Sequence, residues 1–190
     1  LTIGEFKKSK INSYFACGIQ PWISAKFFEH KEEYEKTPYL KKFRILTNSD
    51  IKNSKFKIRL YRVNEKGEPQ NYIYNENIIG IAKKGKRTTE IDVSELNIEF
   101  PEKGFFIAIE WLIIEENKYE YKYIMKGSRK KLKDISYEPA IGIVPAKTNE
   151  NSWRFNKGKW SETSWKNNNE SMKKYRNKYN QLAIELTLTN

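Results

Sequence analysis

The sequence has very little of the residues on which many active sites depend. Among its 190 residues there is one cysteine, Cys17, and one histidine, His30. A single cysteine excludes an internal disulfide, and any histidine metal site or serine-histidine-aspartate triad would have to be built on His30 alone. The aspartates are Asp50, Asp92 and Asp134, and none belongs to a calcium-loop pattern. The sequence therefore predicts neither a metal site nor a cofactor.

The surroundings of His30 and Cys17 favour structural roles for both. His30 stands in a polar segment beside Glu29 and Glu32, which is typical of a solvated loop histidine. Its alternative role is as the partner of a reactive Cys17. Against this, Cys17 shares an odd-numbered apolar register with its neighbours, so we expect a buried and inert thiol. The members of this register are Phe15, Cys17, Ile19, Ile23, Ala25 and Phe27.

Long apolar runs, repeats and nucleotide-binding motifs are also missing. No stretch approaches the roughly 20 apolar residues of a transmembrane helix. No G-x-S-x-G motif, P-loop, dinucleotide fingerprint or fixed-period repeat is present. The chain begins at Leu1 with neither a basic nor an apolar leader, and we expect it to be a processed or excised part of a longer protein.

The best-patterned stretch runs from Lys55 to Ile114 and contains three successive strand patterns. Its last part, residues 104–114, is apolar on both faces except at Glu110. Such a strand is typical of the middle of a sheet whose outer face is also covered. Helix is the alternative, but the abundance of Phe, Ile and Trp and the bracketing by Gly104 and Asn117 favour a strand.

Glu110 is the informative exception in this strand. A carboxylate that loses its water without a partner costs several kcal/mol, so we expect this buried charge to be paired. One interpretation is a structural ion pair with a basic residue on another strand, such as Arg59. The alternative is a polar group at the floor of a ligand groove.

Further strand and turn patterns lie on both sides of this stretch. Alternation predicts strands on either side of Pro21, a short strand over 43–47 and an amphipathic strand over 182–188. The Gly85 turn predicts a hairpin between 77–82 and 87–93.

A second hairpin is predicted to begin with residues 118–125, which lead into a basic loop over 126–138. Together these patterns amount to about nine or ten strands and no long helix. We therefore expect an all-β fold, an antiparallel β-sandwich of jelly-roll type, formed by residues 1–190 as a single domain.

The charge balance bears on partners and not on the fold. There are 36 Lys and Arg residues against 24 Asp and Glu residues, a formal net charge of +12. Such a surface attracts polyanions non-specifically and also keeps a protein in solution. The cations are distributed over several predicted loops, so we expect no specific nucleic-acid site.

Two aromatic groups are candidates for ligand binding. Exposed Trp and Tyr rings can stack on sugar rings, and neighbouring cations can hold acidic groups. The alternative for both groups is ordinary packing, in the core or across strands. The candidates are Trp153, Arg154, Trp160 and Trp165 in the basic aromatic segment, and Tyr119 and Tyr121 in the alternating Tyr119, Tyr121, Tyr123 ladder.

The strand patterns also resemble those of a known family. The segments concerned are Phe56–Val63, Gly67–Pro69, Asn77–Ile79, Glu90–Ile98, Gly104–Trp111, Ser152–Phe155 and Gly158–Trp160. Together they resemble the C-terminal β-sandwich of bacterial envelope proteins that have a carboxypeptidase-like regulatory domain at the N-terminus. The resemblance covers about two thirds of the chain. It implies an exported protein and supplies no catalytic residues.

The function expected from these features is a non-catalytic binding or structural module of an exported bacterial protein. A glycan or an envelope polymer is the expected ligand, and a neighbouring domain or chain is the expected cover of the outer face of 104–114. The alternative is a polysaccharide-active hydrolase with a pair of glutamates about 5 to 10 Å apart.

Overall fold

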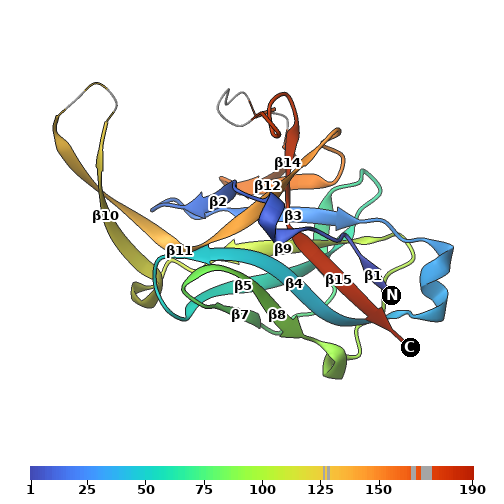
Figure 1. Cartoon of the computed structure of the whole chain (residues 1–190). Coiled ribbons are helices and arrows are strands. Elements are labelled where there is room, and N and C mark those ends of the chain that lie inside the picture. The colour runs from blue at the N-terminus through green and yellow to red at the C-terminus, as the bar shows by residue number, and fades with distance from the viewer. Residues whose placement is uncertain (126, 128, 164–165, 168–172) are drawn as a thin grey trace.

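The chain forms two antiparallel β-sheets that pack face to face. The computed structural model describes residues 1–190 except 126, 128, 164–165 and 168–172 (Figure 1). The first sheet contains β1 (Thr2–Ile3), β2 (Tyr14–Cys17), β4 (Tyr39–Ser49), β8 (Gly85–Asp92), β10 (Lys118–Ile124), β11 (Lys131–Ala146), β14 (Tyr179–Leu182) and β15 (Ile184–Thr189). The second contains β3 (Ile23–Phe28), β5 (Ser54–Val63), β6 (Pro69–Tyr72), β7 (Ile78–Ala82), β9 (Phe105–Trp111), β12 (Ser152–Asn156) and β13 (Lys159–Glu162).

The predicted all-β sandwich is therefore confirmed, although the described residues form fifteen strands instead of nine or ten. Several of the additional strands, such as β1, β6 and β14, have only two to four residues, too few for alternation to be visible in the sequence. Helical structure within the described ranges is limited to short 3₁₀ turns at Lys8–Lys10, Glu32–Lys36, Ser94–Leu96 and Glu115–Asn117. None of it has the length and apolarity needed to cross a membrane.

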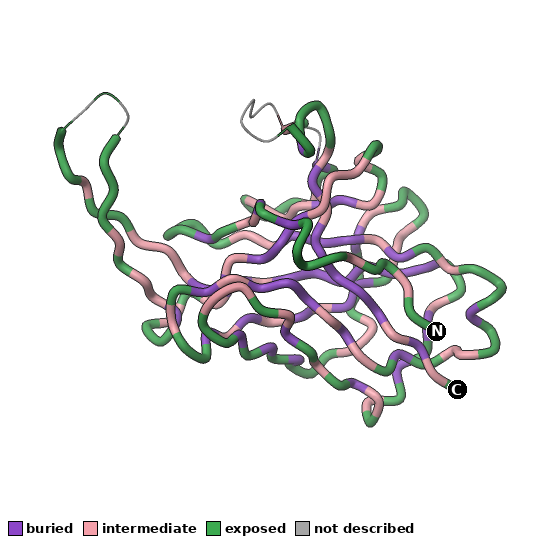
Figure 2. Tube along the Cα trace, viewed as in Figure 1, coloured by how far each residue is buried: buried purple, intermediate pink, exposed green. Residues whose placement is uncertain are grey.

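The core lies between the two sheets and is built from one face of each strand. In β5 the buried residues Phe56, Ile58 and Leu60 alternate with partly exposed residues, as the sequence predicts. The odd-numbered residues of β9 join the same core, and β9 lies between β3 and β5. Figure 2 shows this buried interior running through the centres of the strands.

The predicted hairpin between 77–82 and 87–93 is wrong. β7 pairs with β5 in the second sheet, whereas β8 pairs with β4 in the first. Lys83 and Lys84 therefore lead the chain from one sheet to the other. Local turn chemistry indicates the reversal at Gly85, but the open edges of β5 and β4 offer each strand a longer partner than the other strand would.

The predicted basic loop over 126–138 is also wrong, because Lys131 already begins the 16-residue strand β11. The first part of β11 pairs with β10 from Lys118 opposite Tyr137 to Ile124 opposite Lys131. Leu132 and Ile135 stand three residues apart among polar residues, so they fall on opposite faces of the strand and show no period-two pattern in the sequence. The two strands form a hairpin arm that projects from the sandwich at the left of Figure 1.

Candidate functional site

The outer face of the second sheet has a row of side chains centred on Glu110. Lys57 of β5 lies opposite Glu110 on one side, and Ile23 of β3 lies opposite it on the other. Phe155 of β12 pairs with Ile23, and Trp160 of β13 pairs with Phe155. Directly opposed residues face the same side of a sheet. The row thus brings together a carboxylate, a cation and two aromatic rings that are far apart in the sequence.

Aromatic rings form a continuous stripe across this face. The ring centroids of Tyr72 and Tyr61 are 4.9 Å apart, those of Tyr61 and Trp160 are 5.2 Å apart, and those of Trp160 and Phe155 are 5.3 Å apart. Three strands separate β13 from β5 in the sheet, a distance of about 19 Å at the usual strand spacing. The edge of the sheet must therefore curl over its own outer face. These four residues are called the aromatic stripe below.

Two alanines provide the space that the stripe occupies. Ala25 and Ala108 are direct partners on β3 and β9, and both are buried. Trp153 and Trp160 pack against the cluster that contains them. The outer face of β9 is thus covered largely by the β12–β13 hairpin of the same chain, where the sequence predicted cover from a neighbouring domain or chain.

A tight turn sets the position of the β12–β13 hairpin. Lys157 and Gly158 have φ angles of 51° and 79°, so both central residues of this two-residue turn lie in the left-handed region. This is the geometry of a type I′ turn, whose twist matches that of the flanking strands. The turn fixes Phe155 opposite Trp160.

A hollow of about 450 Å³ lies at the Phe155 end of the stripe, within the size range of small-molecule sites. We call it the Trp22 hollow. Trp22 stacks on Trp111 with ring centroids 4.6 Å apart, and the guanidinium carbon of Arg154 lies 4.7 Å from the centre of the Trp22 ring. The residues that line the Trp22 hollow include Pro21, Trp22, Ile23, Glu110, Phe155 and Lys157.

Glu110 lies between two cations at the edge of this hollow. Its Oε2 atom is 3.2 Å from Nε of Arg59 and 3.6 Å from Nζ of Lys57. The ion pair with Arg59 that the sequence predicts is therefore present. The prediction of a buried charge is wrong, because 31% of the Glu110 side chain is exposed. The aromatic cover ends at the hollow and leaves the carboxylate in contact with solvent.

Tyr61 of the stripe keeps its proton at neutral pH. Burial raises the pKa of Tyr61, and its hydrogen bond with Tyr72 raises it further. The guanidinium of Arg59 lies 5.0 Å from the ring of Tyr72. The site therefore offers the partly exposed rings of Tyr72, Trp160 and Phe155, which the buried Tyr61 joins from below. Cations and one carboxylate flank these rings.

The sequence-predicted binding residues fall in different places. Trp160 belongs to the stripe and Arg154 lies beside Trp22, but Trp153 is only 6% exposed and cannot offer its ring to a ligand. Trp165 lies outside the described residues. Tyr119 and Tyr121 stack on each other on β10, in the other sheet.

The sequence does not single out Tyr61, Tyr72 or Trp22 as binding residues, and Phe155 is noted only within the segment Ser152–Phe155. The first two lie on β5 and β6 and reach the site only because the sheet curls. Trp22 directly follows the expected break at Pro21. For Tyr61 and Phe155 the available signal was an aromatic residue in the outward register of a strand. Trp22 carries no such signal, because it faces the core and stacks on Trp111.

Neither His30 nor Cys17 takes part in this site. The ring of His30 packs edge-on against Tyr34 and Phe100. Cys17 is fully buried, and burial raises the pKa of its thiol to about 11. Within the described part of the chain, no group of His, Cys, Asp and Glu residues could hold a metal ion.

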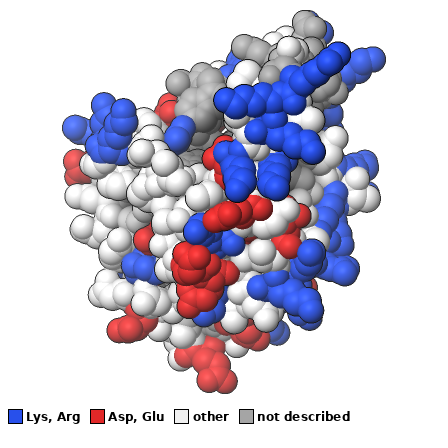
Figure 3. All heavy atoms as spheres, turned by 90° about the vertical axis from the view of Figure 1, so that its left-hand side faces the viewer, with Lys and Arg blue, Asp and Glu red and all other residues white. Residues whose placement is uncertain are grey.

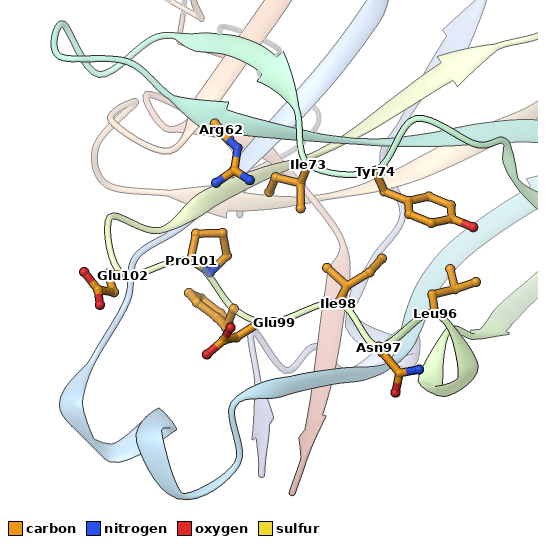
Figure 4. A pocket seen from close by; sticks show the side chains of 10 residues that line it. Arg62, Ile73, Tyr74, Leu96, Asn97, Ile98, Glu99, Pro101 and Glu102 are labelled. Carbon is orange, nitrogen blue, oxygen red and sulfur yellow. The ribbon is translucent and has the colours of Figure 1, made fainter.

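A second hollow, of about 370 Å³, lies beside the segment from Leu96 to Glu102 (Figure 4). Arg62 points toward this space, but the ring of Tyr74 is directed away from Arg62, and Phe100 is turned into the core. This hollow therefore offers polar groups and the half-buried ring of Tyr74 alone. The stripe and the Trp22 hollow combine polar groups with several aromatic rings.

No protein-family model matches the sequence, and no curated protein matches it. Among solved structures, the chain is similar to the crystal structure of the cysteine protease and lectin-like domains of Cwp84, a surface layer associated protein of Clostridium difficile. The TM-score is 0.50 and the identity 11%, over 90% of this chain and 32% of that one. The chain thus spans about a third of that neighbour's length. At this identity the similarity shows a shared fold.

Proposed function

We propose that this chain is a non-catalytic binding module of an exported bacterial protein, and that it holds a glycan or an envelope polymer on the aromatic stripe and in the Trp22 hollow. The observation behind the proposal is that Phe155 connects the aromatic stripe to the Trp22 hollow, because it contacts Trp160 and also lines the hollow. An exported setting is supported by the resemblance of the strand patterns to envelope proteins and by the surface-layer context of the structural neighbour.

The chemistry of the site suits sugar rings. A pyranose ring has apolar C–H faces that pack on aromatic rings, and hydroxyl groups that need polar partners. Tyr72 is 43% exposed and provides such a ring at one end of the stripe. Glu110 and Arg59 provide an acceptor and donors within the same row of strands.

The charge of the site favours a ligand with acidic groups. Glu110 pairs with both Lys57 and Arg59, so the three side chains together carry a net charge of one positive unit. Lys157 adds a cation at the rim of the hollow. A carboxylate or phosphate on the polymer would complement this excess.

The hydrolase alternative needs a second carboxylate across the same groove. Among the described residues that line the Trp22 hollow, Glu110 is the one acidic side chain, and it is engaged by two cations. The geometry therefore supports binding better than hydrolysis.

The test is a glycan array followed by calorimetry with variants of the site. Tyr72→Ala should weaken binding about tenfold, since truncating a well-placed interface aromatic typically costs more than about 1 kcal/mol. Lys157→Asn removes the rim cation and keeps a residue that tolerates a positive φ. It should weaken binding of acidic glycans more than that of neutral ones.

Tyr39→Ala is the matched control, because Tyr39 is 41% exposed and lies on β4 in the other sheet. Loss of affinity in Tyr72→Ala but not in Tyr39→Ala supports the proposal. Equal affinity in the natural chain, Tyr72→Ala and Tyr39→Ala, or no glycan bound by any of them, contradicts it.

A further inference from the structure

The hairpin arm has a composition and a shape that differ from the rest of the molecule. At its base Tyr137 pairs both with Lys118 and with Cys17 of β2. From Tyr119 opposite Ser136 to Ile124 opposite Lys131, the described residues of its two strands pair only with each other. Toward its end both strands are exposed or only partly buried, as Figure 2 shows. An isolated two-stranded ribbon is at best marginally stable in water. A surface that receives the arm would therefore stabilise it.

The end of the arm exposes consecutive apolar side chains. Tyr123 and Ile124 end β10, Met125 follows directly, and the three are 40%, 57% and 55% exposed. Their nearest cross-strand neighbours are Leu132, opposite Tyr123, and Lys131, opposite Ile124. Nothing in the described part of the chain covers them.

Positive charge is concentrated at the same place. In the sequence, residues 121–133 include six Lys and Arg and no Asp or Glu, which is half of the net charge of +12. Lys122 lies directly opposite Lys133, and like charges in this position destabilise a strand pair. Figure 3 faces this side of the molecule and shows Lys and Arg gathered mainly in its upper part, with most Asp and Glu lower down.

From these observations we propose that the end of the arm docks on an anionic lipid surface. Ile124 and Met125 enter the boundary between headgroups and acyl chains, and Tyr123 lies at headgroup level, where tyrosine rings are enriched. Lys122, Lys131 and Lys133 contact the acidic headgroups. A soluble polyanion would satisfy the lysines but would leave the isoleucine and the methionine in water, which is why a lipid surface is the better match.

This site is independent of the aromatic stripe. β10 belongs to the first sheet, whereas every residue of the stripe belongs to the second. Substitutions in one site should therefore leave the other unchanged, and either proposal can fail without the other.

The test is co-sedimentation with vesicles of phosphatidylcholine and with vesicles of an equimolar mixture of phosphatidylcholine and phosphatidylglycerol. The chain should bind the mixed vesicles and not the neutral ones. Ile124→Ser with Met125→Ser should weaken binding about tenfold or more, because two large apolar side chains lose their burial. Lys131→Gln with Lys133→Gln should weaken it about fivefold for each lysine.

The connection between β7 and β8 provides a matched control. Ile81 is 53% exposed and precedes Lys83 and Lys84 at the passage from β7 to β8. Ile81→Ser with Lys83→Gln and Lys84→Gln removes the same types of side chain from another part of the surface. This variant should bind the mixed vesicles as the natural chain does.

A fluorescent label measures insertion directly. The only cysteine is buried and has a raised pKa, so an environment-sensitive maleimide should react selectively with a Met125→Cys variant. The emission should shift to shorter wavelength on mixed vesicles. No shift, equal binding to both vesicle types, or binding of polyuronate without binding of vesicles would each overturn the proposal.

Discussion

The Nε atom of Arg59 lies 3.2 Å from Oε2 of Glu110 across two neighbouring strands, and Lys57 approaches the same oxygen. One carboxylate thus separates two cations on a half-exposed face. Removing its charge leaves Lys57 and Arg59 to repel each other.

We expect Glu110→Gln to lower the free energy of unfolding by about 1 kcal/mol, near the upper end for a partly exposed ion pair. Urea unfolding followed by circular dichroism measures this. Glu115→Gln is the control, since Glu115 also pairs with a lysine, Lys118, but is 83% exposed. Equal losses in the two variants would show that the two cations add nothing to the Glu110 pair.

The alanine floor of the stripe should not tolerate a larger side chain. Ala108→Leu would press against Trp153 and Trp160 and is expected to cost about 1–3 kcal/mol of unfolding free energy, as overpacking usually does. Thermal unfolding measures the cost. Ala16→Leu on the exposed side of β2 is the control. A loss of stability there as large as that in Ala108→Leu would contradict the packing of Trp153 and Trp160 over Ala108.

Lys26 makes the free energy of unfolding depend on pH in the alkaline range. It lies between the sheets, donates to the carbonyl of Ile184, and has a pKa that burial lowers from 10.5 to about 8. Between these values the unfolded chain binds more protons at this position than the folded chain, so stability rises with pH.

The gain is up to about 3 kcal/mol between pH 8 and pH 10.5, from about 1.4 kcal/mol per pKa unit. It is partly offset above about pH 10, where the unfolded tyrosines begin to ionise. Urea midpoints measured from pH 7 to 10 should rise in the natural chain and stay flatter in Lys26→Met. Lys41→Met, at an exposed position, should keep the rise, and a Lys26→Met profile as steep as the natural one would disprove this account.

Cys17 should be nearly unreactive in the folded chain. Its thiol is fully buried, and its pKa is raised to about 11, so the thiolate fraction at pH 8 is lower by about two orders of magnitude than for a free cysteine. An Ellman assay should show slow labelling in buffer and fast labelling in urea. Fast labelling of the folded chain would mean that β2 opens readily.

The sequence is sufficient for the fold class because the inward register is explicit. Phe105, Ile107, Ile109 and Trp111 lead directly to a central strand, and all four are in the core. It is not sufficient for pairing, as β7 and β8 show: a glycine turn between two short strands indicates a reversal but does not indicate which open edges are nearby. Pairing depends on partners that are distant in the sequence.

The candidate site could be predicted only in part for a related reason. Trp160 and the ion pair of Glu110 follow from local composition and from strand register. Tyr61 and Trp160 come into contact only because the sheet curls over two alanines, and no local pattern records curvature. Trp153 illustrates the reverse error, because a tryptophan beside an arginine and lysines looks exposed in the sequence and is buried in the structure.

The passage of the chain at Lys83 and Lys84 ties the two sheets together covalently between neighbouring strands. A shearing force that slides one sheet along the other must stretch this short connection before it can separate the layers. The sandwich should therefore resist mechanical load as a single unit, and rupture should start elsewhere than at this corner.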